Sequence, residues 1–157
     1  MNKKHCPFCS LDVQQSAFAN KSGFMAVPNH SPILPGHALI IPEQHIESLY
    51  ELTDEQIGRF FTFAKVVTGF ITQLYDADAY DWSLQEGEAA GQSVSHLHLH
   101  IIPRHTNDLK PDEDWYVKLQ ASKAIDDSTR EIMDKLTYDR LSKRLKTDWL
   151  LYNSEDK

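Results

Sequence analysis

Histidine alternates with apolar residues over one short segment, and this alternation constrains the fold more than any other feature of the sequence. Residues 93–104 read SVSHLHLHIIPR. Because successive side chains of a β-strand point to opposite faces, His96, His98 and His100 would share one face and the leucines between them the other. We therefore expect a strand over 94–102, with leucines toward the core and histidines toward a site. The alternatives are a half-buried strand whose polar face happens to be histidine, and a loose metal-binding tract.

Other local patterns predict further strands and one long helix. β-Favouring runs at 23–28, 37–42 and 80–85 are separated by turn signals, which indicates strands. A capping box at 53–56 comes before apolar residues at helical spacing, which predicts an amphipathic helix. Its apolar face would contain Ile57, Phe60, Phe61, Ala64, Val67, Ile71 and Leu74.

A second helix is expected near the end of the chain. The capping box at 128–131 opens a charged helical stretch that carries Met133, Leu136, Leu141, Leu145 and Trp149. This pattern does not decide whether the helix docks on its own core or on a partner. Antiparallel strands with one long helix between them and another helix at the end favour an α+β layer structure.

Composition and charge restrict the class of partner. The chain has 157 residues, 41% apolar and 10% aromatic, which is enough to bury one core in a single domain. A formal net charge of −7 disfavours nucleic acid and anionic membranes, but is compatible with a small anionic ligand. No apolar stretch is long enough for a membrane span or resembles a secretory signal, so we expect a cytoplasmic protein.

The two cysteines of the chain, Cys6 and Cys9, stand in the motif CPFC. In a reducing compartment this spacing indicates a metal pair or a redox pair rather than a structural disulfide. A tight turn can direct both thiolates at one metal ion, and a tetrahedral site then needs two more ligands. A redox pair would be expected near a βαβ pattern, which this sequence lacks. A bare surface pair is the third alternative.

The segment HLHLHII at 96–102 resembles the signature of the histidine triad (HIT) superfamily of nucleotide hydrolases and transferases. Residues 34–42 are similar to the family's earlier histidine-bearing strand, and residues 85–93, 103–104 and 115–116 most resemble its fragile histidine triad branch, the diadenosine polyphosphate hydrolases. The resemblance covers about residues 6–120. It implies an antiparallel sheet and a homodimer. We expect one HIT domain over 1–157, with the helical stretch from 121 as a C-terminal extension that lies outside the resemblance.

The resemblance assigns catalytic roles to four histidines. His98 matches the nucleophile that attacks the α-phosphorus and forms a covalent nucleotidyl-histidine. His100 matches the position that contacts the phosphate, His37 the histidine that supports the triad from the second strand, and His96 the first member of the triad. A neutral imidazole is a good nucleophile toward phosphorus when its second nitrogen is held by a hydrogen bond.

Nucleotide contacts are implied at four further positions. Gln85 and Ser93 match residues that bind phosphate or bridging oxygens, Asn29 matches one that binds ribose hydroxyls, and Leu39 is a candidate for the border of a base pocket. Each has a structural alternative: a turn for Asn29, a loop backbone contact for Ser93 and core packing for Leu39. Phe24 is likewise a candidate for the border of the base pocket, with core packing as its alternative. Arg104 could hold phosphate or form a salt bridge.

The zinc-bearing bacterial branch of the superfamily suggests the missing metal ligands. By this resemblance Cys6, Cys9, His45 and His96 form a Cys2His2 site. Four protein ligands close the coordination sphere, so the implied zinc is structural. The Cys pair departs from the eukaryotic diadenosine triphosphatases, so the chain mixes features of two branches and its preferred substrate stays open.

These observations favour a nucleotidyl hydrolase that cleaves diadenosine polyphosphates or related nucleotide conjugates. Two alternatives remain: an adenosine phosphoramidase or aminoacyl-adenylate hydrolase with the same covalent intermediate, and a nucleotide-binding sensor whose turnover is incidental. Uridylyl transfer to a sugar phosphate fits less well, because the spacers around His98 are leucines where that branch has His-Pro-His.

Overall fold

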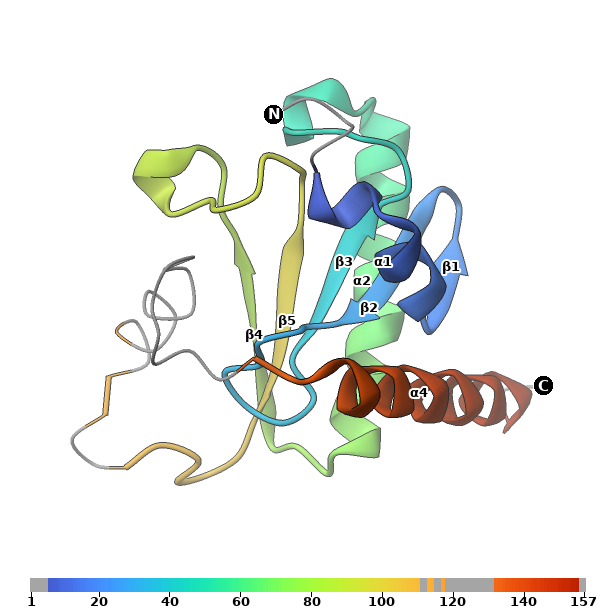
Figure 1. Ribbon diagram of the computed structural model, residues 1–157, viewed down its shortest axis with the longest axis vertical. Coiled ribbons are helices and arrows are strands. Elements are labelled where there is room, and N and C mark those ends of the chain that lie inside the picture. The colour runs from blue at the N-terminus through green and yellow to red at the C-terminus, as the bar shows by residue number, and fades with distance from the viewer. Residues whose placement is uncertain (1–5, 111–112, 115–116, 118–131, 156–157) are drawn as a thin grey trace.

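A five-stranded antiparallel sheet forms the centre of the molecule, in the order β1-β2-β3-β5-β4 (Figure 1). The computed structural model describes residues 6–110, 113–114, 117 and 132–155. The strands are β1 (Ala19–Lys21), β2 (Phe24–Pro28), β3 (Ala38–Pro42), β4 (Ala79–Leu84) and β5 (Leu99–Arg104). The expected strands at 23–28, 37–42 and 80–85 are confirmed to within one residue at each end, whereas β1 was not predicted.

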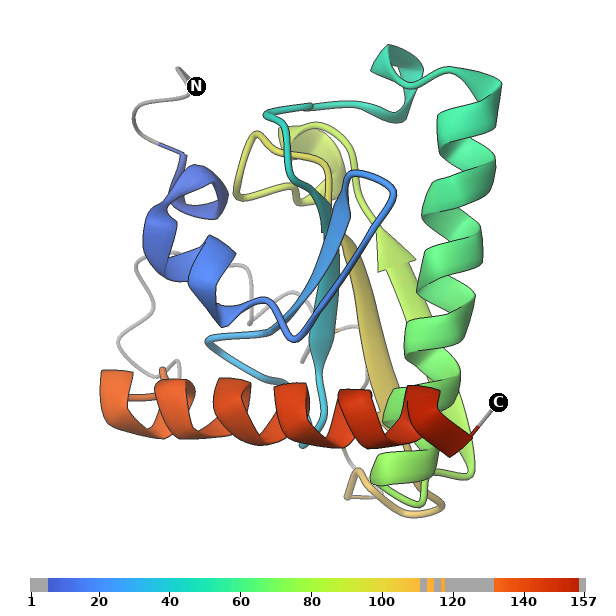
Figure 2. The same ribbon diagram turned by 90° about the vertical axis from the view of Figure 1, so that its right-hand side faces the viewer.

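Helices cover both faces of the sheet, which confirms the α+β class. Figure 2 shows α2 along one face, η2 and α1 on the other, and α4 lying crosswise at one end of the strands. Among the described residues, none of the helices combines the length and the apolar content needed to cross a membrane. The helical bounds are η2 (Pro7–Cys9), α1 (Leu11–Ser16), η3 (Leu49–Glu51), α2 (Asp54–Leu74), η4 (Glu88–Ala90) and α4 (Lys135–Glu155).

The long helix α2 begins at the predicted capping box. The Thr53 hydroxyl accepts from the Gln56 amide, and the Gln56 side chain accepts from the Thr53 amide in return. Its apolar face packs on the sheet, with Ile57, Phe61 and Leu74 at its margin. Fully buried on this face are Phe60, Phe63, Ala64, Val67, Phe70 and Ile71.

The sheet separates two apolar clusters, as alternation along a strand requires. Leu97, Leu99 and Ile101 belong to the larger cluster under α2, so the leucine side of the histidine segment faces the core as expected. Phe24 lies on that side too, against Phe60. Leu39 instead faces the smaller cluster under η2 and α1 and pairs across the sheet with His100.

The histidine strand is shorter than predicted. The expectation of a strand over 94–102 is wrong at its start, because β5 begins at Leu99, which pairs with Ile40 on one side and Leu84 on the other. Upstream of Leu99 the backbone changes partner, and the Leu97 amide donates to the carbonyl of Ile46. His96 and His98 therefore lie on irregular backbone before β5.

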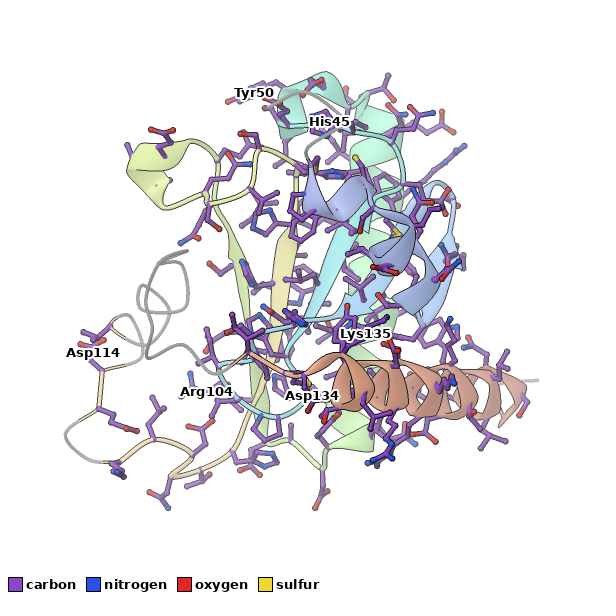
Figure 3. All side chains as sticks on the ribbon, viewed as in Figure 1. His45, Tyr50, Arg104, Asp114, Asp134 and Lys135 are labelled. Atoms are coloured by element: carbon purple, nitrogen blue, oxygen red, sulfur yellow. The ribbon has the colours of Figure 1, made fainter. Side chains whose placement is uncertain are left out.

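The C-terminal helix begins later than expected and docks on the chain's own core. Asp134 caps α4, since its carboxylate accepts from the amide and hydroxyl of Thr137 (Figure 3). The prediction that Met133 is helical is wrong; the capping box at 128–131 lies outside the described residues. Leu145 is buried in the larger cluster and Trp149 packs against it, whereas Leu136 remains exposed.

Candidate functional site

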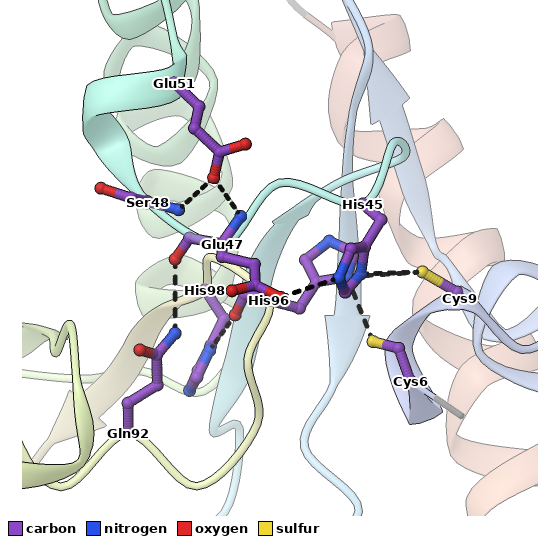
Figure 4. Close-up of polar contacts among 9 residues, drawn as sticks. All are labelled: Cys6, Cys9, His45, Glu47, Ser48, Glu51, Gln92, His96 and His98. Atoms are coloured by element: carbon purple, nitrogen blue, oxygen red, sulfur yellow. Dashed lines mark hydrogen bonds and ion pairs between the residues drawn. The ribbon is translucent and has the colours of Figure 1, made fainter. Parts of the chain in front are cut away.

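Two cysteines and two histidines meet at the end of the sheet where η2 lies. The Nδ1 or Sγ atoms of Cys6, Cys9, His45 and His96 all lie within 4.8 Å of one another (Figure 4). The turn of η2 brings the two thiols together, because the Cys9 amide donates to the Cys6 carbonyl. His96 Nδ1 is 3.4 Å from Cys6 Sγ and 3.6 Å from Cys9 Sγ, and His45 Nδ1 is 3.5 Å from Cys9 Sγ. These four residues could hold a metal ion.

Both histidines of this cluster present the nitrogen that a metal requires. His96 Nε2 lies 3.0 Å from the carbonyl of Pro42, which can only accept, so the proton is on Nε2 and the Nδ1 lone pair faces the sulfurs. His45 has its Nε2 3.2 Å from a carboxylate oxygen of Glu47. Such outer partners fix the tautomer and orientation of a metal-binding imidazole. Burial lowers the pKa of His96 to about 4, so its ring is neutral.

His98 presents the opposite nitrogen. Its Nδ1 lies 2.7 Å from the carbonyl of His96, so Nδ1 carries the proton and Nε2 has a free lone pair. The side chain is 5% exposed, and burial lowers its pKa, which keeps the imidazole neutral. The ring edge of Phe8 packs 5.3 Å from the His98 ring, measured between centroids. A neutral, oriented imidazole with a free Nε2 can act as a nucleophile or base.

A chain of hydrogen bonds fixes the proton of His100. The Ile33 amide donates to His37 Nδ1, so neutral His37 carries its proton on Nε2. That nitrogen is 2.9 Å from His100 Nδ1, which must then accept, leaving an N–H on Nε2 of His100. The ring centroids of His98 and His100 are 5.0 Å apart, so the two imidazoles are neighbours in the site.

The turn before His37 depends on a glycine. Gly36 has φ of 85°, in the left-handed region that other residues rarely adopt. A Cβ added there would lie 2.8 Å from side-chain atoms of both Tyr75 and Pro103, which leaves no room for it. Glycine at this position therefore lets the chain turn sharply into β3 and bring His37 to His100.

The four candidate nucleotide contacts fall into two groups. Asn29 lies against the His37 ring, with its amide nitrogen 3.1 Å from Nε2, and its carbonyl oxygen accepts from the Ser31 amide. Leu39 is buried beside His100 and packs in the smaller apolar cluster. Gln85 lies at the start of the connection between β4 and β5 and Ser93 lies within it, and both are half-buried.

Two residues that sequence reasoning missed hold this connection in place. The Glu86 carboxylate accepts from the Ser48 hydroxyl at 2.9 Å and from the Leu49 amide at 2.6 Å. Gln92 accepts from the Gly87 amide. It also donates to the Glu47 carbonyl, as Figure 4 shows. The connection that carries Gln85 and Ser93 is therefore tied to the segment that follows His45. The capping box that opens at Ser48 was a readable signal for that segment.

Arg104 forms salt bridges. Its guanidinium contacts Asp81 at 2.5 Å and Asp108 at 2.7 Å, at the end of β5 far from His45 (Figure 3). These contacts favour the salt-bridge alternative over phosphate binding. Residues 115–116, part of the resemblance to the fragile histidine triad branch, lie outside the described residues.

Comparison with known proteins decides the family. A family model described as "HIT domain" matches residues 11–107. This chain belongs to the HIT domain family. The bis(5'-nucleosyl)-tetraphosphatase (asymmetrical) of Schizosaccharomyces pombe is 34% identical over 117 residues, which is 74% of this chain and 64% of that protein, so the chain spans less than two thirds of this relative. The bis(5'-adenosyl)-triphosphatase of Dictyostelium discoideum is 29% identical over 107 residues, 68% of this chain and 72% of that protein.

Solved HIT structures share the fold of the chain. A zinc-bound histidine triad family protein from Mycobacterium smegmatis superposes with a TM-score of 0.69 and 22% identity. The match covers 98% of this chain and 99% of that one, so it includes the C-terminal region beyond the matched HIT domain.

Proposed function

We propose that the protein is a nucleotidyl hydrolase that cleaves diadenosine polyphosphates through a covalent intermediate on His98. The observation that carries this proposal is the hydrogen bond from His98 Nδ1 to the His96 carbonyl, which leaves Nε2 free to attack. The names of the relatives from S. pombe and D. discoideum support the substrate class.

The reaction proceeds in two displacements at one phosphorus. In the first, His98 Nε2 forms a bond to the α-phosphorus, and the bond from that phosphorus to the bridging oxygen breaks. The leaving nucleoside phosphate takes the electron pair. In the second, water attacks the same phosphorus and loses a proton to solvent, the N–P bond breaks with its electron pair returning to Nε2, and a mononucleotide is released with His98 restored.

The neighbouring histidines would stabilise charge in both steps. His100 Nε2–H is oriented by His37 and can donate to a phosphate oxygen as negative charge develops there. We propose that Asn29 and Leu39 contact the nucleoside, and that Gln85 and Ser93 contact phosphate oxygens. In support, Asn29 lies against His37, and Leu39 lies opposite His100 on the neighbouring strand.

The metal is proposed to be zinc in a structural role. A Cys2His2 donor set is typical of closed tetrahedral zinc sites. When bound, the ion would cross-link η2, the segment after β3 and the segment before β5, which hold the four donors. The backbone of His96 would be fixed by this cross-link, and with it the carbonyl that orients His98.

The assembly is proposed to be a homodimer that pairs through β4, with residues 1–157 of each copy forming one domain. β4 is an edge strand of the described sheet and exposes Tyr80 by 52% and Trp82 by 37%. These rings border an open groove of about 600 Å³ that also contains Phe61 and Lys65. An antiparallel edge can pair with its own copy about a two-fold axis. We also propose a cytoplasmic location, since a pair of cysteines placed as metal ligands is typical of a reducing compartment.

A substrate screen tests the function. Purified protein is assayed with diadenosine triphosphate, diadenosine tetraphosphate and adenosine phosphoramidate, with the His98→Ala variant as a control. The proposal expects the highest kcat/KM on a diadenosine polyphosphate and none above background in the variant. A preference for the phosphoramidate would assign the protein to the alternative hydrolase class. Tight binding without turnover of any of the three would assign it to the sensors.

A further inference from the structure

The first turn of α4 contacts the end of β2 and the loop that follows it, residues 29–37. The Tyr138 hydroxyl donates to the Pro28 carbonyl at 3.1 Å and lies 2.9 Å from the Ser16 hydroxyl. The Tyr138 ring meets the His30 ring edge-on, with centroids 5.2 Å apart. Just before α4, the Met133 amide donates to the His30 carbonyl at 3.0 Å. The C-terminal segment, residues 133–155, thus contacts Pro28 and His30, the two chain neighbours of Asn29.

Asn29 is the residue of this loop whose side chain contacts the ring of His37. Its backbone amide donates to the His37 carbonyl, and its side chain lies against the His37 ring. The side chain is buried, and its carbonyl oxygen accepts from the Ser31 amide. A small shift of Pro28 or His30 would therefore move the Asn29 amide relative to His37.

We propose that Tyr138 is a positioning residue that, with the C-terminal segment, sets the affinity of the site for the nucleoside part of the substrate through Asn29. This inference rests on the proposed function and names the part of the substrate that the C-terminal segment controls. Burial raises the pKa of Tyr138, which keeps its hydroxyl protonated as a donor over the range in which the protein would be assayed.

The hydrogen bond that orients the nucleophile does not involve Tyr138, and Asn29 reaches the other histidines through its contacts with His37. His98 takes its orientation from the His96 carbonyl, which lies before β5 and has no hydrogen bond to Tyr138. His100 takes its orientation from His37, whose Nδ1 is held by the Ile33 amide. Losing the Tyr138 hydroxyl should therefore weaken mainly the binding of the substrate, which raises KM and leaves kcat within about twofold of wild type.

The test compares two tyrosines of one helix in the full-length protein. Tyr138→Phe removes the hydroxyl that holds Pro28, whereas Tyr152→Phe makes the same change where the ring packs on Phe70 and Trp149. Steady-state kinetics use diadenosine triphosphate, calorimetry measures the Kd for adenosine monophosphate, and a thermal melt is recorded for each variant. His30→Ala probes the same loop from its exposed side.

For Tyr138→Phe we expect KM and Kd to rise roughly three- to tenfold, the range for one lost hydrogen bond, with kcat within about twofold of wild type. For Tyr152→Phe both should stay within about twofold, and His30→Ala should raise KM and Kd about two- to threefold. Unchanged KM and Kd in Tyr138→Phe would overturn the inference, as would equal changes in both tyrosine variants that follow their loss of melting temperature.

Failure of the proposed function gives a different result. If the wild type binds adenosine monophosphate but hydrolyses no dinucleotide, the hydrolase assignment is wrong, and the Kd values alone support or overturn the role of Tyr138. If the wild type binds no adenosine monophosphate, both the function and the inference are overturned.

Discussion

His96 and His98 are two residues apart and chemically identical, yet the fold prepares them for different tasks. His96 bonds a backbone carbonyl through Nε2 and turns Nδ1 toward two thiols. His98 bonds a backbone carbonyl through Nδ1 and turns Nε2 away from it. The role of a buried histidine is therefore set by the ring nitrogen that bonds to the backbone, because the other nitrogen keeps the lone pair.

The nucleophile depends on the metal site, but the metal site does not depend on the nucleophile. The carbonyl that orients the nucleophile belongs to His96, a candidate metal ligand, whereas none of the four metal donors takes its orientation from the His98 ring. Damage at the metal site should therefore affect both stability and turnover. Damage at His98 should affect turnover alone.

Replacing His98 by Ala should separate the two sites most sharply. We expect kcat to fall by roughly 10³-fold or more, because the attacking atom is lost, while the melting temperature and the metal content stay near wild type. Assays of turnover, thermal melting and elemental analysis on the same preparation check this. His105→Ala, an exposed histidine at the far end of β5, is the matched control and should change none of the three. Turnover at the wild-type level in His98→Ala would show that another group attacks.

Removing one metal ligand should damage both sites. Cys9→Ser is expected to lower the melting temperature, because metal binding energy stabilises only the folded state. It should also lower turnover by up to about a hundredfold, since a displacement of about 1 Å at the nucleophile can cost that much. Wild-type protein should contain one zinc per chain by elemental analysis.

Metal exchange provides the control for this variant. Cobalt keeps tetrahedral geometry, so the cobalt-loaded wild type should turn over substrate at nearly the rate of the zinc form. A large change in rate or in pH profile at equal stability would mean that the metal takes part in the chemistry and that the proposed ligand set is wrong.

Replacing His37 should have a smaller effect on turnover than His98→Ala or Cys9→Ser. His37→Ala leaves His98 with its carbonyl partner but removes the donor that fixes the proton of His100. We expect kcat to fall about tenfold, the upper range for one neutral hydrogen bond, with unchanged metal content. Single-turnover kinetics would show the loss in the chemical step. An unchanged single-turnover rate would remove His37 from the mechanism.

The smallest effect is expected at Asp108, which touches neither site. The Arg104 guanidinium lowers the pKa of the Asp108 carboxyl, against a smaller opposing effect of burial. Because the folded pKa lies below the unfolded value of about 3.9, the pair stabilises the fold above that pH and loses its contribution as the pH falls through the folded pKa. The gain for such a pair is up to about 1 kcal/mol.

Denaturant unfolding at several pH values checks this. Asp108→Asn should lower the free energy of unfolding slightly near neutral pH and flatten its decline below about pH 4, with turnover unchanged. A variant that loses turnover would show that the Arg104 salt bridges reach the active site. A pH dependence identical to wild type would show that the pair does not contribute to stability.

Local patterns predicted much of the fold, for physical reasons that individual residues illustrate. The helix after Thr53 was predictable because its capping box and apolar spacing are both local. The start of β5 was not, because it depends on where β3 ends and on the Ile46 carbonyl that takes over as partner of Leu97. The start of α4 follows Asp134, whose capping role was not recognised in the sequence.

The candidate site was also predictable only where local sequence or the family resemblance determines it. Alternation of histidine and leucine predicted which side chains face the core, and the resemblance to histidine triad proteins grouped the four metal donors that the structure brings together. No local pattern could have indicated that Ile33 and His37 set the tautomer of His100, or that Tyr138 reaches Pro28. Those contacts join segments far apart in the sequence, so only the folded chain reveals them.

Attack of His98 Nε2 on phosphorus would leave a covalent intermediate that can be trapped. Wild-type protein is mixed with labelled diadenosine triphosphate, quenched within one turnover under alkaline conditions that preserve a histidine–phosphorus bond, and digested for mass spectrometry. The account predicts one nucleotidyl group on the peptide containing residues 96–100, located at His98 and absent from the His98→Ala variant. A nucleotidyl group on His96 or His100, or full wild-type turnover with no trapped adduct, would contradict it.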